Sequence, residues 1–133
     1  MRYKIITYII LLIFTSLSWS ASHHPNAFLQ KIRGEDQEGE AIVQHFCSNC
    51  HSANPLIPLG APQIANKNDW EFRLKKGSNL LFMHTQEGLN AMPPRGGCFE
   101  CTDKQLLLAI IAMLPVTYQK SFISDLKDYN KYN

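Results

Sequence analysis

The sequence predicts an all-α fold in which one small helical domain follows a short leader. Apolar residues recur three and four positions apart in several segments, which is the spacing of a single helix face. No segment shows the alternation of apolar and polar residues that is typical of a strand. The 133 residues, 45% hydrophobic and 18% charged, suit one folded domain and exclude extended disorder.

Residues 1–20 have the pattern of a secretory signal peptide. The basic residues Arg2 and Lys4 precede an almost unbroken apolar run over 5–17, and small residues follow. This run is shorter than the ~20 residues that span a bilayer. We therefore expect cleavage after Ser20 and export to an oxidising compartment, the periplasm. The alternative is an uncleaved anchor, which would place the domain at a membrane only if the segment is retained.

Removal of this leader would leave a formally neutral protein. Two of the 13 Lys and Arg residues lie in the leader, and the other 11 balance 11 Asp and Glu. Nucleic-acid-binding domains carry a basic excess, so we expect no nucleic-acid partner.

The rest of the chain divides into a lead at 21–34, a domain at 35–114 and a tail at 115–133. The lead is expected to be loose or weakly structured. The tail is polar, but three of its large side chains keep helical spacing, which allows a short docked helix. These side chains are Phe122, Leu126 and Tyr129.

In the domain, the first helix is expected to begin near 35–39. Ile42 and Phe46, four residues apart, give it an apolar face. Proline and glycine then break residues 52–66 into a loop. The loop is nevertheless apolar, and its large side chains are expected to cover an apolar group: Leu56, Ile57, Leu59 and Ile64.

A short helix at 69–75, capped by Asn68 or Asp69, is expected next. Ser78 then caps a helix that reaches Glu87 and ends at Gly88.

After a Pro- and Gly-rich loop at 91–97, Thr102 and Gln105 form a capping-box pattern. The helix that follows, at 103–114, is the most apolar segment after the leader and should be buried on two sides.

The chemistry of the chain is concentrated in Cys47-Ser48-Asn49-Cys50-His51. Two cysteines three apart lie on one face of a helical turn. Their thiols can therefore add to the two vinyl groups on one edge of a porphyrin. The next residue, His51, is then placed to reach the iron, and C-x-x-C-H is the attachment motif of c-type haem.

Zinc binding and thiol redox chemistry are the alternatives, because a second pair, Cys98 and Cys101, is present. The 47 residues between the pairs far exceed the ~15–20 of common zinc ribbons. His51 would also have no role in a four-thiolate site. A thioredoxin-like pair belongs to a βαβ unit, of which the sequence has no sign.

A second axial ligand decides between electron transfer and small-molecule binding. Met92 is the strongest candidate, since its loop position lets it turn inward and the two prolines that follow stiffen the backbone. Met83 is expected to face the core from its helix, and His45 is too near Cys47 to reach the opposite haem face. The full set of candidates is Met83, Met92, Met113, His23, His24, His45 and His84.

Residues 35–114 resemble the class I cytochromes c, and in particular the cytochrome c5 type. C-x-x-C-H combined with M-P-P-x-G-G-C-x-x-C is far more specific than either motif alone. The resemblance rests on Gly39, Cys47-Ser48-Asn49-Cys50-His51, Gly60-Ala61-Pro62, Trp70-Glu71-Phe72-Arg73, Ala91-Met92-Pro93-Pro94-Arg95-Gly96-Gly97-Cys98-Phe99-Glu100-Cys101 and the helix at 103–114.

This resemblance implies three to five helices around one haem c, bonded covalently through Cys47 and Cys50. His51 would be the proximal iron ligand and Met92 the distal one. The Pro62 carbonyl would accept a hydrogen bond from His51 Nδ1 and so fix the imidazole.

Three further assignments are implied. Cys98 and Cys101 would form a disulfide, and Trp70 and Arg73 would lie near the haem propionates. Thr102, rather than histidine, follows Cys101, so the second pair is not a second haem site.

One departure concerns the final helix, where the family usually has an aromatic residue against the glycine of the first helix. Ala112 occupies the matching position here. We expect either a closer helix crossing or a tail aromatic, Tyr118 or Phe122, in the gap.

The implied activity is one-electron transfer by low-spin iron in a respiratory chain, without enzymatic catalysis. The partners would be donor and acceptor cytochromes or a terminal oxidase. An open-iron enzyme or gas sensor is the rival, but helical haem carriers of that kind place C-x-x-C-H near the C-terminus. Four basic residues either ring an exposed haem edge and steer an acidic partner or are scattered solvated charges: Lys67, Lys75, Lys76 and Arg95.

Overall fold

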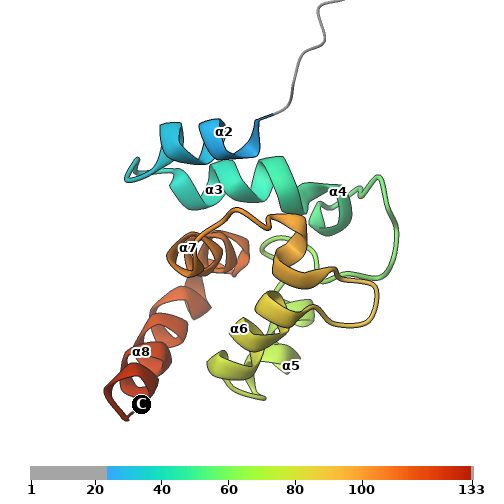
Figure 1. Cartoon of the computed structure of the whole chain (residues 1–133). Coiled ribbons are helices and arrows are strands. Elements are labelled where there is room, and N and C mark those ends of the chain that lie inside the picture. Colours follow the sequence, from blue (N-terminus) through green and yellow to red (C-terminus); the bar gives the residue numbers. More distant parts are fainter. Residues whose placement is uncertain (1–23, 133) are drawn as a thin grey trace, which may run out of the picture.

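The structure is a computed structural model that describes residues 24–132, with side chains through Leu126. The expected signal peptide at 1–20 lies outside the described residues. Within this range every regular element is helical, and the one β-type pairing is an isolated bridge between Leu89 and Met92. The all-α prediction is therefore confirmed (Figure 1).

The lead contains a helix that the sequence interpretation missed. Helix α2 spans Pro25–Ile32, starts with proline in its first turn and runs beside the first helix of the domain (Figure 1). Leu29 is only 2% exposed and belongs to the core. The expectation of a weakly structured lead is wrong for these residues, because an eight-residue helix gains its stability from packing rather than from its own sequence.

The first helix of the domain has three joined parts. Helix α3 spans Glu38–Ile42, a π-helical turn η1 spans Val43–Cys47, and helix α4 spans Ser48–His51. The expected helix into the cysteine motif is confirmed, whereas the π-helical turn was not predicted. Such turns occur mostly as single insertions in α-helices, frequently at functional sites.

Helix α5 spans Lys67–Leu74, two residues earlier than expected at its start. Its cap is Asn66, whose side chain accepts hydrogen bonds from the backbone N–H groups of Asn68 and Asp69. Asn66 is therefore the cap, instead of Asn68 or Asp69, because its side-chain oxygen binds free N–H groups of the first helical turn.

Helix α6 spans Ser78–Glu87, as expected, but Ser78 is not its cap. Gly77 holds that position, and the buried Ser78 hydroxyl donates instead to Asp125 Oδ2 at 2.8 Å. This bond joins the start of α6 to the tail.

Helix α7 spans Asp103–Met113 and begins with the predicted capping box, in which Thr102 and Gln105 each bond to the other's backbone N–H. Its buried positions include Leu106, Ala109 and Ile110. This confirms α7 as the core helix.

Helices α3 and α7 cross in backbone contact at Gly39. A Cβ atom at this position would lie 2.5 Å from the Leu108 carbonyl oxygen and 3.4 Å from Ala112 Cβ. The closer crossing that Ala112 suggested is therefore present. A surface pocket remains beside it, lined in part by Ile111, Ala112 and Gln119.

A buried polar pair reinforces the crossing. The Gln105 amide donates to Glu38 Oε1 at 2.8 Å, and Glu38 Oε2 accepts from the Gly34 N–H at 2.9 Å. Both side chains are buried. Because buried polar groups are stable only when they are hydrogen-bonded, these contacts fix the rotation of α3 against α7.

The tail forms a longer helix than expected. Helix α8 spans Val116–Tyr132 and places Phe122, 1% exposed, and Leu126 in the core. Phe122 is thus a tail aromatic that belongs to the hydrophobic core, and the partly buried Tyr118 packs against this core. The expected third position of this face, Tyr129, lies beyond the described side chains.

We predict that Gly39→Ala lowers the free energy of unfolding by about 2 kcal/mol, because the added methyl group must push the α7 backbone away. Urea unfolding of the intact protein measures this change. Gly60→Ala is the control, since Gly60 has a positive φ but no atom within 4 Å of the place that its Cβ would take. If Gly39→Ala lowers the free energy of unfolding no more than Gly60→Ala does, the close contact between α3 and α7 is contradicted.

Candidate functional site

The cysteine–histidine motif lies at the junction of the π-helical turn and α4. Cys47 ends the turn, and Cys50 and His51 lie in the single turn of α4. Neither cysteine takes part in a disulfide, and both are half-buried. The helical path therefore brings two thiols and one imidazole onto neighbouring positions of one turn, as the spacing predicted.

His51 is held by a contact from a distant loop. Its Nδ1 donates to the Pro62 carbonyl oxygen at 2.7 Å, and the residue is 7% exposed. The hydrogen bond fixes the ring orientation and leaves Nε2 as the nitrogen for a metal. Burial lowers the pKa of His51, with a smaller lowering from the Arg73 charge and an opposing contribution from the Pro62 bond. The imidazole is thus neutral near pH 7, the state in which it binds metals.

The loop that supplies Pro62 is itself fixed on both sides. The Ile64 N–H donates to the His51 carbonyl at 2.8 Å, and the buried Trp70 indole donates to the Gln63 carbonyl at 2.8 Å. Asp69 Oδ2 accepts from the Gln63 N–H at 2.9 Å. The sequence interpretation did not single out Gln63, because this residue acts through its backbone N–H and carbonyl groups, which any residue could supply.

The two side chains that the resemblance places near the haem propionates, Trp70 and Arg73, also make hydrogen bonds within the protein. The indole N–H is donated to Gln63, and Arg73 Nη1 donates to the Asp69 carbonyl of its own helix. Trp70 is thereby part of the support for Pro62.

Burial raises the pKa of Cys47 to about 11, and the neighbouring Cys50 adds to this shift. The Cys47 thiol is therefore protonated near pH 7. Redox-active dithiols work through thiolates of lowered pKa. This environment argues against the thioredoxin-like alternative.

Met92 lies in a tight turn between α6 and the 3-10 turn η2, which spans Pro94–Gly97. Leu89 and Met92 exchange both backbone hydrogen bonds, at 3.1 and 3.0 Å, and Asn90 between them has a φ of 55°. The Met92 methyl group lies 3.6 Å from the position of a Cβ at Gly96. The backbone hydrogen bonds of this turn therefore restrict the position of Met92.

Glycine is required where α6 meets this turn. A Cβ at Gly88 would lie 2.7 Å from the Met92 carbonyl oxygen and 3.0 Å from the Pro94 nitrogen, and its φ is 86°. Gly88 thus permits both the left-handed backbone and the close approach of the Met92 segment.

The second cysteine pair forms a disulfide, the one that the resemblance implies. Cys98 and Cys101 are bonded to each other and are both buried. Their sulfurs are therefore not thiolates that could bind zinc with Cys47 and Cys50. Within residues 24–132, no group of three or more His, Cys, Asp or Glu side chains is arranged to hold a metal ion.

Among the other candidate iron ligands, His84 is half-buried on α6. Met83 is 40% exposed on α6, so the expectation that it faces the core is wrong, whereas Met113 is buried in α7. His45 stacks on Phe28, with ring centroids 4.3 Å apart. His24 precedes α2, and His23 lies outside the described residues.

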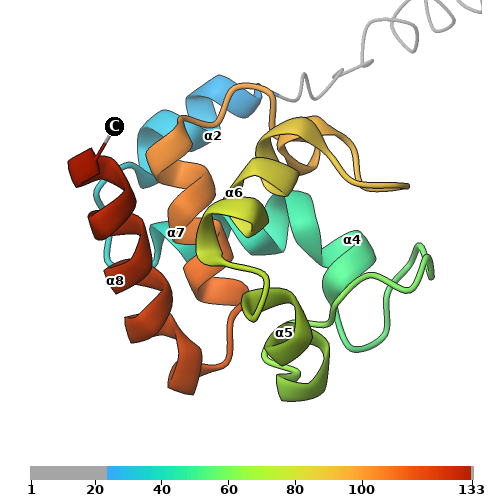
Figure 2. The ribbon, with the colours of Figure 1, turned by 90° about the horizontal axis from the view of Figure 1, so that it is seen from below.

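The loop that follows the motif and the Met92 turn project on the same side of the molecule as α4 (Figures 1 and 2). Leu56 and Leu59 of this loop are exposed, as is Leu89 of the turn, and Leu56 reaches 82%. The turn η1 packs against η2, which brings Cys47 and the Met92 segment to one region. Exposed apolar side chains thus lie on both segments that project on the side of α4.

The four basic residues, interpreted either as a ring around a haem edge or as scattered charges, lie in different surroundings. Lys75 pairs with Glu71 at 3.1 Å, and Lys76 lies 4.4 Å above the Phe72 ring, both at the end of α5. Lys67 is exposed at the start of the same helix. Arg95 is not a free surface charge, because it is bonded to Cys101 and Asp103.

These residues fit a covalent haem. The two thiols are available on one turn, the buried imidazole presents Nε2, and a thioether is held in a turn nearby. The set offers a nitrogen and a sulfur donor, a combination that can ligate haem iron.

Comparisons with known proteins identify related cytochromes. The family described as cytochrome C oxidase, cbb3-type, subunit III, matches residues 34–110. Cytochrome c5 of Azotobacter vinelandii is 35% identical over 79 residues, which are 58% of this chain and 92% of that protein. Cytochrome c5 of Ectopseudomonas mendocina is 34% identical over 82 residues, covering 60% and 91% of the two chains.

Cytochrome c-555 of Chlorobaculum tepidum is 30% identical over 80 residues, 57% of this chain and 71% of its own. The chain belongs to the class I cytochromes c. It is most similar to the c5 type, which confirms the resemblance found in the sequence motifs. The family carries covalent haem c through cysteines, and its members transfer electrons rather than catalyse reactions, so the cytochrome is an electron-transfer protein.

The family match leaves α2 and α8 of this cytochrome outside its range. Both nevertheless supply core side chains, Leu29 and Phe122. Among the described residues, no helix has the length and hydropathy needed to cross a membrane.

We predict that Gly88→Ala destabilises the cytochrome by at least about 2 kcal/mol more than Gly77→Ala, measured by urea unfolding of the haem-loaded protein. Both glycines flank α6 with positive φ, 86° and 104°, but only Gly88 has backbone atoms close to its Cβ position. Equal losses would mean that the left-handed backbone alone, and not contact with the Met92 segment, requires Gly88.

Proposed function

We propose that this cytochrome is a periplasmic one-electron carrier of a respiratory chain. It would hold a single haem c, bonded through Cys47 and Cys50, with low-spin iron ligated by His51 and Met92. The observation that carries this proposal is the buried His51 imidazole, fixed through Nδ1 by Pro62 at 2.7 Å, next to two unpaired thiols.

When bound, the haem supplies a one-electron iron couple, and the chain's own residues set its properties. Pro62 fixes the tautomer of His51, so the ligand nitrogen points the same way before and after electron transfer. Met92 would contribute a soft sulfur, which favours reduced iron and raises the reduction potential. Apolar side chains of the following loop, such as Ile64, would keep water away.

The support for Met92 comes from the way its turn is built. Backbone bonds to Leu89 and the close approach of the chain at Gly88 restrict its position. A ligand that is held before the iron arrives loses little conformational entropy on binding.

The proposed partners are donor and acceptor cytochromes or a terminal oxidase. With the leader removed, 11 basic residues balance 11 acidic residues, so the net charge would not steer association. Local charge at the end of α5, where Lys75 and Lys76 are exposed, would act on an acidic partner instead.

We predict that Met92→Ala converts a closed iron site into an open one. The reduced wild-type protein should not bind carbon monoxide readily, whereas the variant should bind it at once, because removal of the thioether exposes an iron position. Visible spectra with and without carbon monoxide measure this. Met83→Ala is the control and should behave as wild type, since Met83 is exposed on α6. If the visible spectra of Met92→Ala, with and without carbon monoxide, equal those of wild type, the assignment of Met92 as a ligand is refuted.

We also predict that the protein purified from a periplasmic extract carries the mass of one haem beyond the chain from Ala21. Intact-mass measurement tests the covalent bonds, the haem number and cleavage of the leader in one spectrum. Cys47→Ala and Cys50→Ala should each leave one thioether and a shifted absorption spectrum. A protein that retains residues 1–20 and fractionates with membranes would favour the anchored alternative.

The rival is an open-iron sensor or enzyme. Carbon monoxide binding by the wild-type protein as rapid as by Met92→Ala would favour it.

A further inference from the structure

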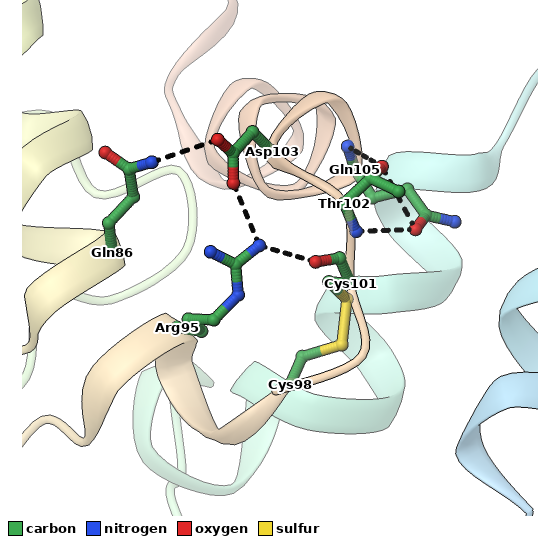
Figure 3. Close-up of polar contacts among 7 residues, drawn as sticks. All are labelled: Gln86, Arg95, Cys98, Cys101, Thr102, Asp103 and Gln105. Atoms are coloured by element: carbon green, nitrogen blue, oxygen red, sulfur yellow. Dashed lines mark hydrogen bonds and ion pairs between the residues drawn. A yellow bond between two sulfur atoms is a disulfide. The ribbon is translucent and has the colours of Figure 1, made fainter.

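Arg95, three residues after Met92 in the chain, is the centre of a polar network (Figure 3). One of its terminal nitrogens, Nη2, donates to the Cys101 carbonyl and to Asp103 Oδ1, the latter at 2.9 Å. The other oxygen of Asp103, Oδ2, accepts from the Gln86 amide at 3.2 Å. The network therefore joins the Met92 segment to the end of α6, to the disulfide loop and to the first turn of α7.

The backbone at Arg95 is held in an unusual conformation. Its φ is 59°, and Gly96 and Gly97 continue with φ of 61° and 83°. A long side chain disfavours this left-handed region, whereas glycine tolerates it. A residue other than glycine at this point indicates that the side chain compensates for the strain, since such strain persists only where the surroundings enforce it.

The guanidinium is also partly removed from water. The Arg95 side chain is 24% exposed, and its Nε is buried without a hydrogen-bond partner. A charge in such surroundings depends on its few partners more than a surface charge does. The exposed pair Lys75–Glu71, with side chains 71% and 45% exposed, is the contrasting case in the same protein.

We propose that Arg95 is a positioning residue that locks the Met92 turn against the start of α7 and thereby keeps the Met92 thioether on the haem iron. This inference rests on the proposed function, in which Met92 is a ligand. The hydrogen bonds of the Arg95 side chain go to Cys101 and Asp103, so Arg95 acts on the ligand through the backbone of residues 93–97. The Gly96 N–H donates to the Pro93 carbonyl at 3.0 Å, so a shift at Arg95 is transmitted directly towards Met92.

If the lock is lost, the turn should open more often and free an iron position for an added ligand. The apparent affinity of that ligand rises with the fraction of molecules in which the turn is open. Loss of charge-assisted hydrogen bonds of this kind should raise the fraction of molecules with an open turn about ten-fold.

The experiment measures imidazole binding to the oxidised, haem-loaded protein, together with the red absorption band of sulfur-ligated ferric iron. Arg95→Gln and Asp103→Asn should each bind imidazole about ten-fold more tightly than wild type, with a weaker sulfur band. Lys75→Gln and Glu71→Gln remove the same charges from the exposed pair, and we expect them to match wild type. Thermal unfolding is recorded for every variant.

Arg95→Lys is the rescue variant. Both observed bonds come from the single nitrogen Nη2, so a lysine ammonium can provide them, and we expect imidazole binding close to that of wild type. A lower melting temperature of Arg95→Gln with unchanged imidazole affinity and sulfur band would show a merely structural role and overturn the proposal.

A failure of the proposed function would give different spectra from a failure of the Arg95 proposal. Met92→Ala, measured in the same series, should lose the sulfur band entirely. If wild type lacks the band as well, the Met92 assignment is wrong. A different outcome would refute only the role of Arg95. In that case wild type has the sulfur band, Met92→Ala loses it, and Arg95→Gln has the same band and imidazole affinity as wild type.

Discussion

Gly39 lies against the Leu108 carbonyl so closely that a Cβ atom would come within 2.5 Å of the oxygen, and α3 and α7 therefore cross in backbone contact. This constraint sets the positions of both halves of the site. Helix α3 continues through the π-helical turn into Cys47, Cys50 and His51, and α7 begins directly after the disulfide loop that follows Met92. The buried Glu38–Gln105 bond fixes the rotation between the two helices.

From this crossing, two loops extend to the same side of the molecule (Figures 1 and 2), and hydrogen bonds to backbone groups hold each of them. The first brings the Pro62 carbonyl to His51, with Gln63 bound by Trp70 and Asp69. The second brings Met92 into a turn closed by Leu89. If His51 and Met92 are the iron ligands, as proposed, this support would keep the iron geometry similar in both oxidation states.

The elements outside the family match also contribute to this arrangement. Helix α2 inserts Leu29 beside the crossing, and α8 inserts Phe122 and bonds through Asp125 to the start of α6. A small domain buries only a modest fraction of its surface. The two helices outside the family match therefore enlarge the core.

The sequence by itself determined the helical class, the cysteine–histidine motif, the capping box at Thr102 and the family, because these depend on local spacing and residue type. Only the tertiary structure decided that 25–32 is a helix, that Asn66 caps α5, that Met83 is exposed and that Arg95 is bonded to Asp103. Short helices, caps and side-chain exposure depend on what packs against them across the chain, and local sequence does not encode those partners.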